Sequence, residues 1–161
     1  MINVTFRPVA EADWEQVLTV ERLTSTGQVW GRHQFDSLLS EAHTFLTVCV
    51  YRKRVIAYVL YRNEGDSTEV LALAVLPAYQ RQGIATRMLL KLCHRARTLK
   101  KRCLYFTVRE SNRPMLNLCK KLQLFSTKLL REHYEDTSED GICFVFDGLT
   151  QNLRTNTFNR A

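Results

Sequence analysis

The sequence predicts a single α/β (α+β) domain with a mixed, mostly antiparallel sheet of about seven strands and about four flanking helices. Two observations lead to this class. Short β-branched and aromatic runs alternate with segments of helical periodicity, and one strand–helix–strand unit requires a right-handed parallel crossover. A chain of 161 residues fits one domain. The predicted boundaries are 1–149 for the domain and 150–161 for a polar C-terminal tail.

The N-terminal half predicts one strand, two helices and a hairpin. INVTFRPV alternates as a strand, and Asp13 is then the candidate cap of a helix over WEQVLTVERL, where apolar residues recur at helical spacing. A glycine-containing loop leads to a shorter helix, HQFDSLLSEA. The stretch FLTVCVYRKRVIAYVLYRNEGD follows and predicts two strands around a basic turn.

The C-terminal half contains the crossover. EVLALAVL (69–76) is continuously apolar after its first residue, which is typical of a central strand covered on both faces. A helix over 83–98 and the strand CLYFTV complete the unit. SNRPMLNLCKKL predicts another helix, with Asn112 as its cap. FSTKLLREHY and GICFVFDGL predict two closing strands.

Composition excludes several classes of protein. Apolar residues make up 45% and charged residues 24% of the chain, as in ordinary globular proteins. No apolar run approaches the ~20 residues of a membrane span, and the N-terminus lacks the shape of a signal peptide. We therefore expect a cytoplasmic protein with no membrane partner. The five cysteines show no metal-ligand spacing, so we expect no metal and mostly buried thiols.

The net charge of +7 is unevenly distributed. Residues 70–109 contain no acid, whereas 132–140 form an acidic segment. The basic half indicates an anionic ligand, and the acidic segment indicates a cationic one. A nucleic-acid partner is disfavoured because the chain shows no nucleic-acid-binding motif.

The anionic ligand is expected at YQRQGIAT (79–86), where the apolar strand ends and the basic helix begins. A helix N-terminus presents free N–H groups and the positive end of the helix dipole. Small residues at Gly83 and Ala85 let a ligand approach the backbone closely. The stretch therefore predicts an anion site.

These residues resemble a known family. LAVLPAYQRQGIATRMLL resembles the acetyl-CoA signature Q/R-x-x-G-x-G/A of the GNAT superfamily of N-acetyltransferases, and VRESNRPMLNLCKKLQL resembles the second cofactor motif of that superfamily. The order of elements is similar over nearly the whole chain. VWGRHQF and REHY resemble segments of the bacterial ribosomal-protein N-terminal (alanine) acetyltransferases. The resemblance implies a GNAT-like sheet with a central splay, and transfer of an acetyl group from acetyl-CoA to a primary amine, foremost a protein N-terminal α-amino group.

The resemblance also implies which residues bind acetyl-CoA. The pyrophosphate would lie on the turn before the second long helix, and the pantetheine arm would pair with the fourth strand where it splays from the fifth. The matching cofactor-binding residues are Leu73, Ala74, Val75, Arg81, Gln82, Gly83, Ile84, Ala85, Thr86 and Asn112. Arg87, Lys91 or the cluster 100–102 would meet the 3′-phosphate, or form a solvated basic face.

At two catalytic positions the sequence differs from the ribosomal-protein subgroup that it resembles. Thr107 stands where that subgroup has its glutamate base, and Cys119 stands where it has the tyrosine that protonates the thiolate. Glu69, at the start of the central strand, has the spacing of the catalytic glutamate in histone-type members and is the predicted base. Cys119 and Tyr134 are the candidate acids, with Tyr105 as a further candidate.

Two other functions stay open at the level of sequence. One is a small-amine acetyltransferase acting on a polyamine or an antibiotic. The other is a catalytically degenerate acyl-CoA-binding module, which Thr107 and Cys119 would explain. The sheet edge near the last two strands pairs in this superfamily, so a homodimer is a further alternative.

Overall fold

The computed structural model describes residues 1–146. The predicted tail, 150–161, lies outside these residues, as does the last part of the predicted domain. Within them, seven strands form one sheet with the order β1-β2-β3-β4-β5-β7-β6. The strands are β1 Thr5–Pro8, β2 Thr44–Tyr51, β3 Arg54–Glu64, β4 Ser67–Val75, β5 Cys103–Arg109, β6 Phe125–Tyr134 and β7 Glu139–Phe146. The helices are α1 Trp14–Thr24, α2 Arg32–Leu39, α3 Ile84–Thr98 and α4 Arg113–Lys121. The predicted fold class is confirmed.

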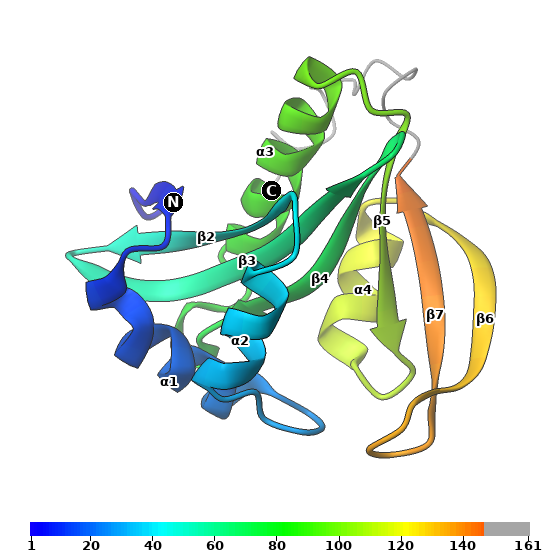
Figure 1. The fold of residues 1–161 in the computed structure, drawn as a ribbon, viewed down its shortest axis with the longest axis horizontal. Helices are drawn as coiled ribbons and strands as arrows, with labels where there is room; N and C mark the ends of the chain where they lie inside the picture. The colour runs from blue at the N-terminus through cyan, green and yellow to red at the C-terminus, as the bar shows by residue number, and fades with distance from the viewer. Residues whose placement is uncertain (147–161) are drawn as a thin grey trace.

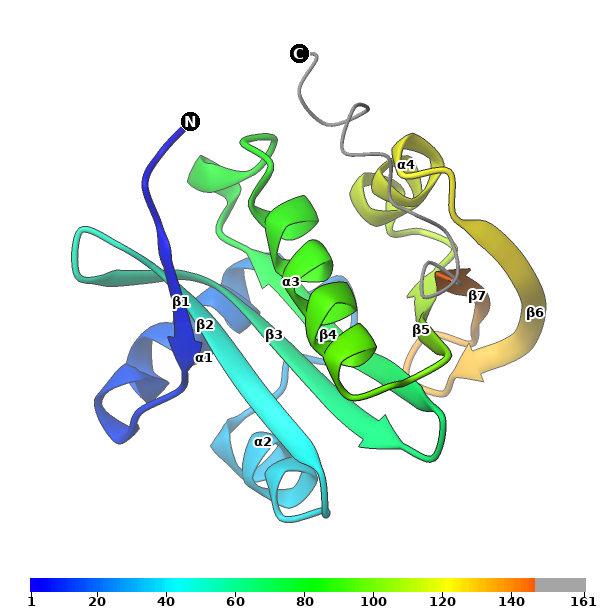
Figure 2. The same ribbon diagram turned by 90° about the horizontal axis from the view of Figure 1, so that it is seen from above.

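The helices cover the sheet on both faces. Figure 2 shows α3 on one face of the sheet and α1 and α2 on the other. Each face has its own apolar core, and the strand β3 contributes side chains to both cores. Seven consecutive residues of β3 are buried, as expected for a strand covered on both sides.

An aromatic cluster fixes the two N-terminal helices under the sheet. Phe35 of α2 is fully buried and lies 5.5 Å, between ring centroids, from Trp14 of α1 and from Tyr58 of β3. Trp30, in the connection between the helices, meets the same ring edge-on at 5.6 Å. These contacts hold the α1–α2 connection against β3 beside the site described below.

The sheet opens between its only parallel pair of strands in the described chain. β4 and β5 pair over Ser67–Val70 and Cys103–Phe106 and then separate; Figure 1 shows the strands meeting at one end and diverging toward the other. On the opposite side of β4, a bulge occurs where Ala72 faces Leu60 but Val70 faces Tyr61. A bulge bends the strand that carries it. The central splay is therefore confirmed, and it leaves one edge of β4 without a neighbouring strand.

One local prediction at the N-terminus was wrong. Asp13 does not cap α1 through its side chain. Its carboxylate instead accepts hydrogen bonds from Arg7 at 2.6 and 2.8 Å and from the backbone N–H of Ala10 at 2.7 Å. An ion pair with β1 outcompetes the cap because the residues before α1 form a short 3₁₀ turn, Glu11–Asp13.

Candidate active site

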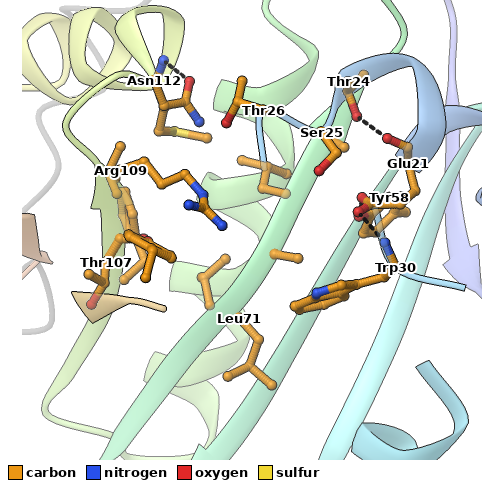
Figure 3. A pocket seen from close by; sticks show the side chains of 18 of the residues that line it. Glu21, Thr24, Ser25, Thr26, Trp30, Tyr58, Leu71, Thr107, Arg109 and Asn112 are labelled. Carbon is orange, nitrogen blue, oxygen red and sulfur yellow. Dashed lines mark hydrogen bonds between the residues drawn. The ribbon is translucent and has the colours of Figure 1, made fainter. Parts of the chain in front are cut away.

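The splay between β4 and β5 forms a cavity of about 190 Å³ that is lined from both faces of the sheet. Its floor is β4 from Val70, the last residue paired with β5, along the open edge to Ala74. Leu89 of α3, together with Asn112 and Met115 at the start of α4, lines it from one face. The end of α1 and the loop after it line it from the other face (Figure 3). Two reactants can therefore meet inside the sheet after entering from opposite sides.

The turn before α3 presents a row of free backbone donors. Gly83 has the left-handed φ of 76° and forms the N-cap of the helix. Among the described residues, the backbone N–H groups of 81–86 have no hydrogen-bond acceptor, and the first helical bond runs from Arg87 N to Gly83 O. Successive free N–H groups in a left-handed turn at a helix N-terminus form an anion site. This geometry fits the pyrophosphate of acetyl-CoA.

The open edge of β4 fits the remainder of the cofactor. Leu73 and Ala74 line the cavity, whereas Val75 is buried and does not. A strand edge with unpaired N–H and C=O groups pairs readily with an extended chain, and a pantetheine arm carries two amides that can do so. Ala85 lies within α3 and keeps a negative φ, as alanine at this position requires.

Asn112 has a structural role that does not use its whole side chain. Its Oδ1 accepts a hydrogen bond from Met115 N at 3.2 Å and caps α4. The side chain also lines the cavity, and Figure 3 shows it facing the splay. The amide NH₂ group thus stays available for a ligand.

Substitutions of Asn112 separate these two roles. We expect Asn112→Ala to lower the free energy of unfolding by about 1 kcal/mol, because the cap is lost. Asn112→Ser keeps a capping oxygen and is expected to retain stability while binding acetyl-CoA several-fold more weakly. Urea denaturation and calorimetry measure the two effects. Unchanged cofactor affinity in the serine variant would leave Asn112 as a cap alone.

The basic face of α3 is occupied by contacts within the chain. Arg87 lies 5.4 Å and Lys91 5.3 Å from the ring centre of Phe6, and Arg87 also donates to the backbone oxygen of Ile2 at 3.2 Å. Arg95 lies 5.6 Å from the ring centre of Phe45. A cation that packs on an aromatic face is stabilised by that contact, so these residues have a structural role without any ligand. A contact between this face and the 3′-phosphate stays a prediction.

Glu69, the predicted base, lies outside the cavity lining. It belongs to the paired part of β4, opposite Tyr105, before the splay begins. Its carboxylate accepts a hydrogen bond from Arg62 at 2.8 Å. The sequence predicts apolar surroundings for Glu69 and does not indicate Arg62 as a neighbour. Arg62 faces Glu69 through the pairing of β3 with β4, and the sequence does not reveal this register. The role of Glu69 stays a prediction, with a geometry that does not favour it.

The two candidate acids lie in different surroundings. Cys119 is fully buried, does not line the cavity, and has its thiol pKa raised to about 12 by burial. Tyr134 lines the cavity and donates from its hydroxyl to the backbone oxygen of Thr107 at 3.1 Å. Burial raises the pKa of Tyr134, so the hydroxyl keeps its proton at neutral pH. Geometry thus favours Tyr134 over Cys119.

A buried carboxylate that was not predicted from the sequence lines the opposite side of the cavity. Glu21 of α1 is 7% exposed, and its Oε2 accepts a hydrogen bond from the Tyr58 hydroxyl at 2.5 Å. Its Oε1 accepts from the backbone N–H of Trp30 at 3.1 Å. Residues 14, 17 and 21 follow the i, i+3, i+7 spacing of the buried stripe of α1. The presence of an acid on this buried stripe was the sequence signal that could have identified Glu21 as a functional residue.

An ion pair connects three segments around the cavity. Arg109, at the end of β5, binds Asp136 of the β6–β7 loop through two hydrogen bonds of 3.0 and 2.9 Å. Asp136 also accepts from the backbone N–H of Gln28, in the α1–α2 connection, at 2.6 Å. We call this set the Arg109–Asp136 bridge. Its hydrogen bonds, foremost those from Arg109, hold the pKa of Asp136 below its ordinary value.

The bridge changes the interpretation of the acidic segment 132–140. Asp136 and Glu139 face Arg109, and Asp140 pairs with Arg131 at 3.2 Å. These carboxylates therefore have cationic partners within the chain. Asp136, through Gln28 and Arg109, also holds the α1–α2 connection, which lines the cavity, against β5.

Opening the bridge is expected to weaken the acceptor side of the site selectively. In Asp136→Asn the charge-assisted hydrogen bonds, each typically worth about 1.5–3 kcal/mol, are lost. We expect KM for the acceptor to rise about tenfold and KM for acetyl-CoA to stay nearly constant. Glu135→Gln, the neighbouring exposed acid for which the described chain shows no ion pair, is the matched control. Equal effects of the two variants in steady-state kinetics would contradict the role of the bridge.

The donor row and the open edge of β4 are the two features that the resemblance to the acetyl-CoA signature implied. Residues 10–123 match the sequence profile of the acetyltransferase (GNAT) family. The chain belongs to this family. It is an acetyl-CoA-dependent N-acetyltransferase of the GNAT type, and acetyl-CoA is its acetyl donor.

Individual relatives of this GNAT protein include N-terminal acetyltransferases. An N-alpha-acetyltransferase of Saccharolobus solfataricus is 27% identical over 152 residues, which cover 83% of this chain and 87% of the relative. Among solved structures, the ribosomal-protein-S18-alanine N-acetyltransferase of Escherichia coli superimposes with a TM-score of 0.78 at 21% identity, over 89% of this chain and 93% of that one. NAA60 of Arabidopsis thaliana, bound to a bisubstrate analogue, gives 0.78 at 19% identity, over 89% and 97% of the two chains. These structural likenesses concern the fold.

Residues 1–146 lack two kinds of feature. No helix in this part of the chain has the length and apolarity needed to span a membrane. In the same residues, no cluster of three or more histidine, cysteine or acidic side chains has the arrangement of a metal site. Three of the cysteines, Cys49, Cys93 and Cys119, are buried.

Proposed function

We propose that this GNAT acetyltransferase acts on the α-amino group of a protein or peptide N-terminus. The observation that carries the proposal is the charge of the cavity. Among its described lining residues, Glu21 is the one carboxylate and Arg109 the one cation. Such a site suits an acceptor with a single positive charge at its reacting end.

A polyamine fits this lining less well. A polycation is held by several carboxylates along its length, whereas the other acids near the opening, Asp136 and Glu139, are already paired with Arg109. The polar groups of the α1–α2 connection that line the cavity, such as Ser25 and Thr26, are suited to hydrogen bonds with a peptide backbone. The N-alpha-acetyltransferase relatives support the same acceptor.

The proton chemistry also favours an α-amine. At pH 7 about 10% of an α-amino group of pKa ~8.0 is neutral, against about 0.04% of a lysine side chain of pKa ~10.4. Thr107 stands where the subgroup that the sequence resembles has a glutamate base, so the strand β5 offers no carboxylate at that position. A site with limited basic assistance acetylates the less basic amine more easily.

The reaction assigns a role to each side of the cavity. Acetyl-CoA supplies a thioester whose C–S bond breaks as the amine nitrogen bonds to the acetyl carbon. The sulfur takes one proton, and one proton of the starting ammonium is released. The backbone of 81–86 and the edge of β4 at Leu73 and Ala74 would hold the donor. Tyr134 would provide the proton for the sulfur.

A panel of acceptors tests the proposal. The purified protein is incubated with acetyl-CoA and peptides with free N-termini, N-blocked peptides that contain lysine, spermidine, or an aminoglycoside. Thiol release and mass spectrometry report turnover. We expect the free N-terminal peptides to have the highest kcat/KM. Turnover of spermidine or the aminoglycoside alone would identify a small-amine enzyme, and binding of acetyl-CoA without turnover of any amine would identify a degenerate module.

A further inference from the structure

Glu21 is a buried carboxyl group with no cationic partner among the described residues. Its carboxylate receives two neutral donors, the Tyr58 hydroxyl and the Trp30 N–H, and it forms no ion pair within residues 1–146. A buried carboxylate normally has a cationic partner, because neutral hydrogen bonds offset only part of the free energy lost on desolvation. In the described structure the face of Glu21 toward the cavity therefore lacks a countercharge.

The cavity shows where the countercharge would come from. Glu21 and Tyr58 lie at the end lined by α1 and the α1–α2 connection, across β4 from Arg109 and Asn112 (Figure 3). The donor row at 81–86 precedes α3, which covers the opposite face of the sheet. A ligand that reaches Glu21 from the α1 side meets the open edge of β4 without passing the cofactor turn. This is the path of the acceptor.

Building on the proposed function, we propose that the Glu21 carboxylate binds the ammonium group of the acceptor and takes its proton. In this step an N–H bond of the ammonium breaks and an O–H bond forms on Glu21, which later releases the proton to water. The neutral amine keeps the electron pair with which it attacks the acetyl carbon. Glu21 thus assumes the role that the sequence suggested for Glu69.

The surroundings of Glu21 suit this step. Tyr58 and the Trp30 N–H orient both carboxylate oxygens from two different elements, β3 and the α1–α2 connection. The other titratable groups that line the cavity are Arg109 and Tyr134. Arg109 is neutralised by Asp136, and burial raises the pKa of both tyrosines. No other group of the lining is then a base at neutral pH.

Glu21→Gln tests the charge while preserving the contacts. The glutamine oxygen can accept from Trp30 N–H, and the Tyr58 hydroxyl can accept from the amide NH₂. We expect kcat/KM for the acceptor to fall at least 100-fold at pH 7, as for loss of a general base, with acetyl-CoA affinity and thermal stability near those of the wild type. Glu15→Gln, the same exchange on the exposed side of α1, is the matched control.

The pH profile distinguishes this role from a merely structural one. Raising the pH from 7 to 9.5 raises the neutral fraction of an α-amine of pKa ~8.0 about tenfold without a base, so the deficit of Glu21→Gln should shrink by up to about tenfold. If the substitution only damaged the structure of the α1–α2 connection, the deficit in kcat/KM would be the same at all pH values. A constant deficit, near-wild-type activity at pH 7, or a large loss in Glu69→Gln with Glu21→Gln active would each overturn the proposal.

The choice of acceptor separates this proposal from the proposed function. If the wild type acetylates spermidine but no peptide, the proposed function fails, and the same variants are compared on spermidine. A 100-fold loss of kcat/KM for spermidine in Glu21→Gln would then support the Glu21 proposal, and retained activity would overturn it. If the wild type acetylates no amine of the panel, both fail.

Discussion

Gly83→Val is expected to weaken acetyl-CoA binding about 100-fold or more. Gly83 has φ of 76°, a conformation that costs a side-chain-bearing residue about 1–2 kcal/mol. Valine would shift this backbone to negative φ and turn neighbouring N–H groups of 81–86 away from the bound phosphates. Charge-assisted hydrogen bonds are worth about 1.5–3 kcal/mol each, so losing two of them gives an effect of this size. Isothermal calorimetry with acetyl-CoA measures it.

Gly65→Val provides a closely matched control. Gly65, in the β3–β4 turn, also has a left-handed φ, of 48°, and a Cβ would meet no atom within 4 Å at either glycine. Both variants therefore suffer similar backbone strain, but Gly65 lies in the turn between β3 and β4 and not in the turn 81–86 that carries the donor row. Gly65→Val should lose stability and keep its affinity for acetyl-CoA. If Gly83→Val also kept its affinity, the pyrophosphate would not bind at 81–86.

Tyr134→Phe is expected to lower kcat about 100-fold while leaving acetyl-CoA affinity nearly unchanged. The hydroxyl lies in the cavity lining and holds its proton at neutral pH, so its removal takes away the proposed acid for the leaving sulfur. Because the pKa of Tyr134 lies above its ordinary value of about 10, the alkaline limb that it causes in the kcat profile should appear only above that pH.

Two further variants decide whether this effect is specific. Tyr61→Phe removes a hydroxyl from a buried tyrosine of β3 that does not line the cavity, and it should retain kcat. Cys119→Ala tests the alternative acid, whose thiol is on the buried side of α4. A large loss of kcat in Cys119→Ala, with Tyr134→Phe active, would reverse the assignment.

The fold was largely predictable because its signals are local. The periodicity of 84–98 places Ile84, Met88 and Leu92 on one side, and the structure buries all three. The apolar run of β4 indicated a strand covered on both faces. The role of Asp13 was not predictable, since its choice between capping α1 and pairing with Arg7 depends on how β1 docks.

The cofactor side of the site was more predictable than the acceptor side. A strand, a glycine turn and a helix follow one another within 67–98, so the donor row follows from one continuous stretch of sequence. The acceptor side combines α1, β3, the end of β5 and the end of β6. Partners such as Glu21 with Tyr58 are 37 residues apart, and no local pattern indicates which distant groups meet.

A competition between two amines of one peptide tests the proposal that the acceptor is an N-terminal α-amine. A peptide that begins with alanine and contains one lysine is incubated with acetyl-CoA and the protein at pH 7, and fragmentation mass spectrometry locates the acetyl group. Both amines are then present at the same concentration in the same molecule. We predict acetylation of the α-amine with the lysine unmodified. Acetylation of the lysine alone, or of neither amine while spermidine is acetylated, would contradict the account.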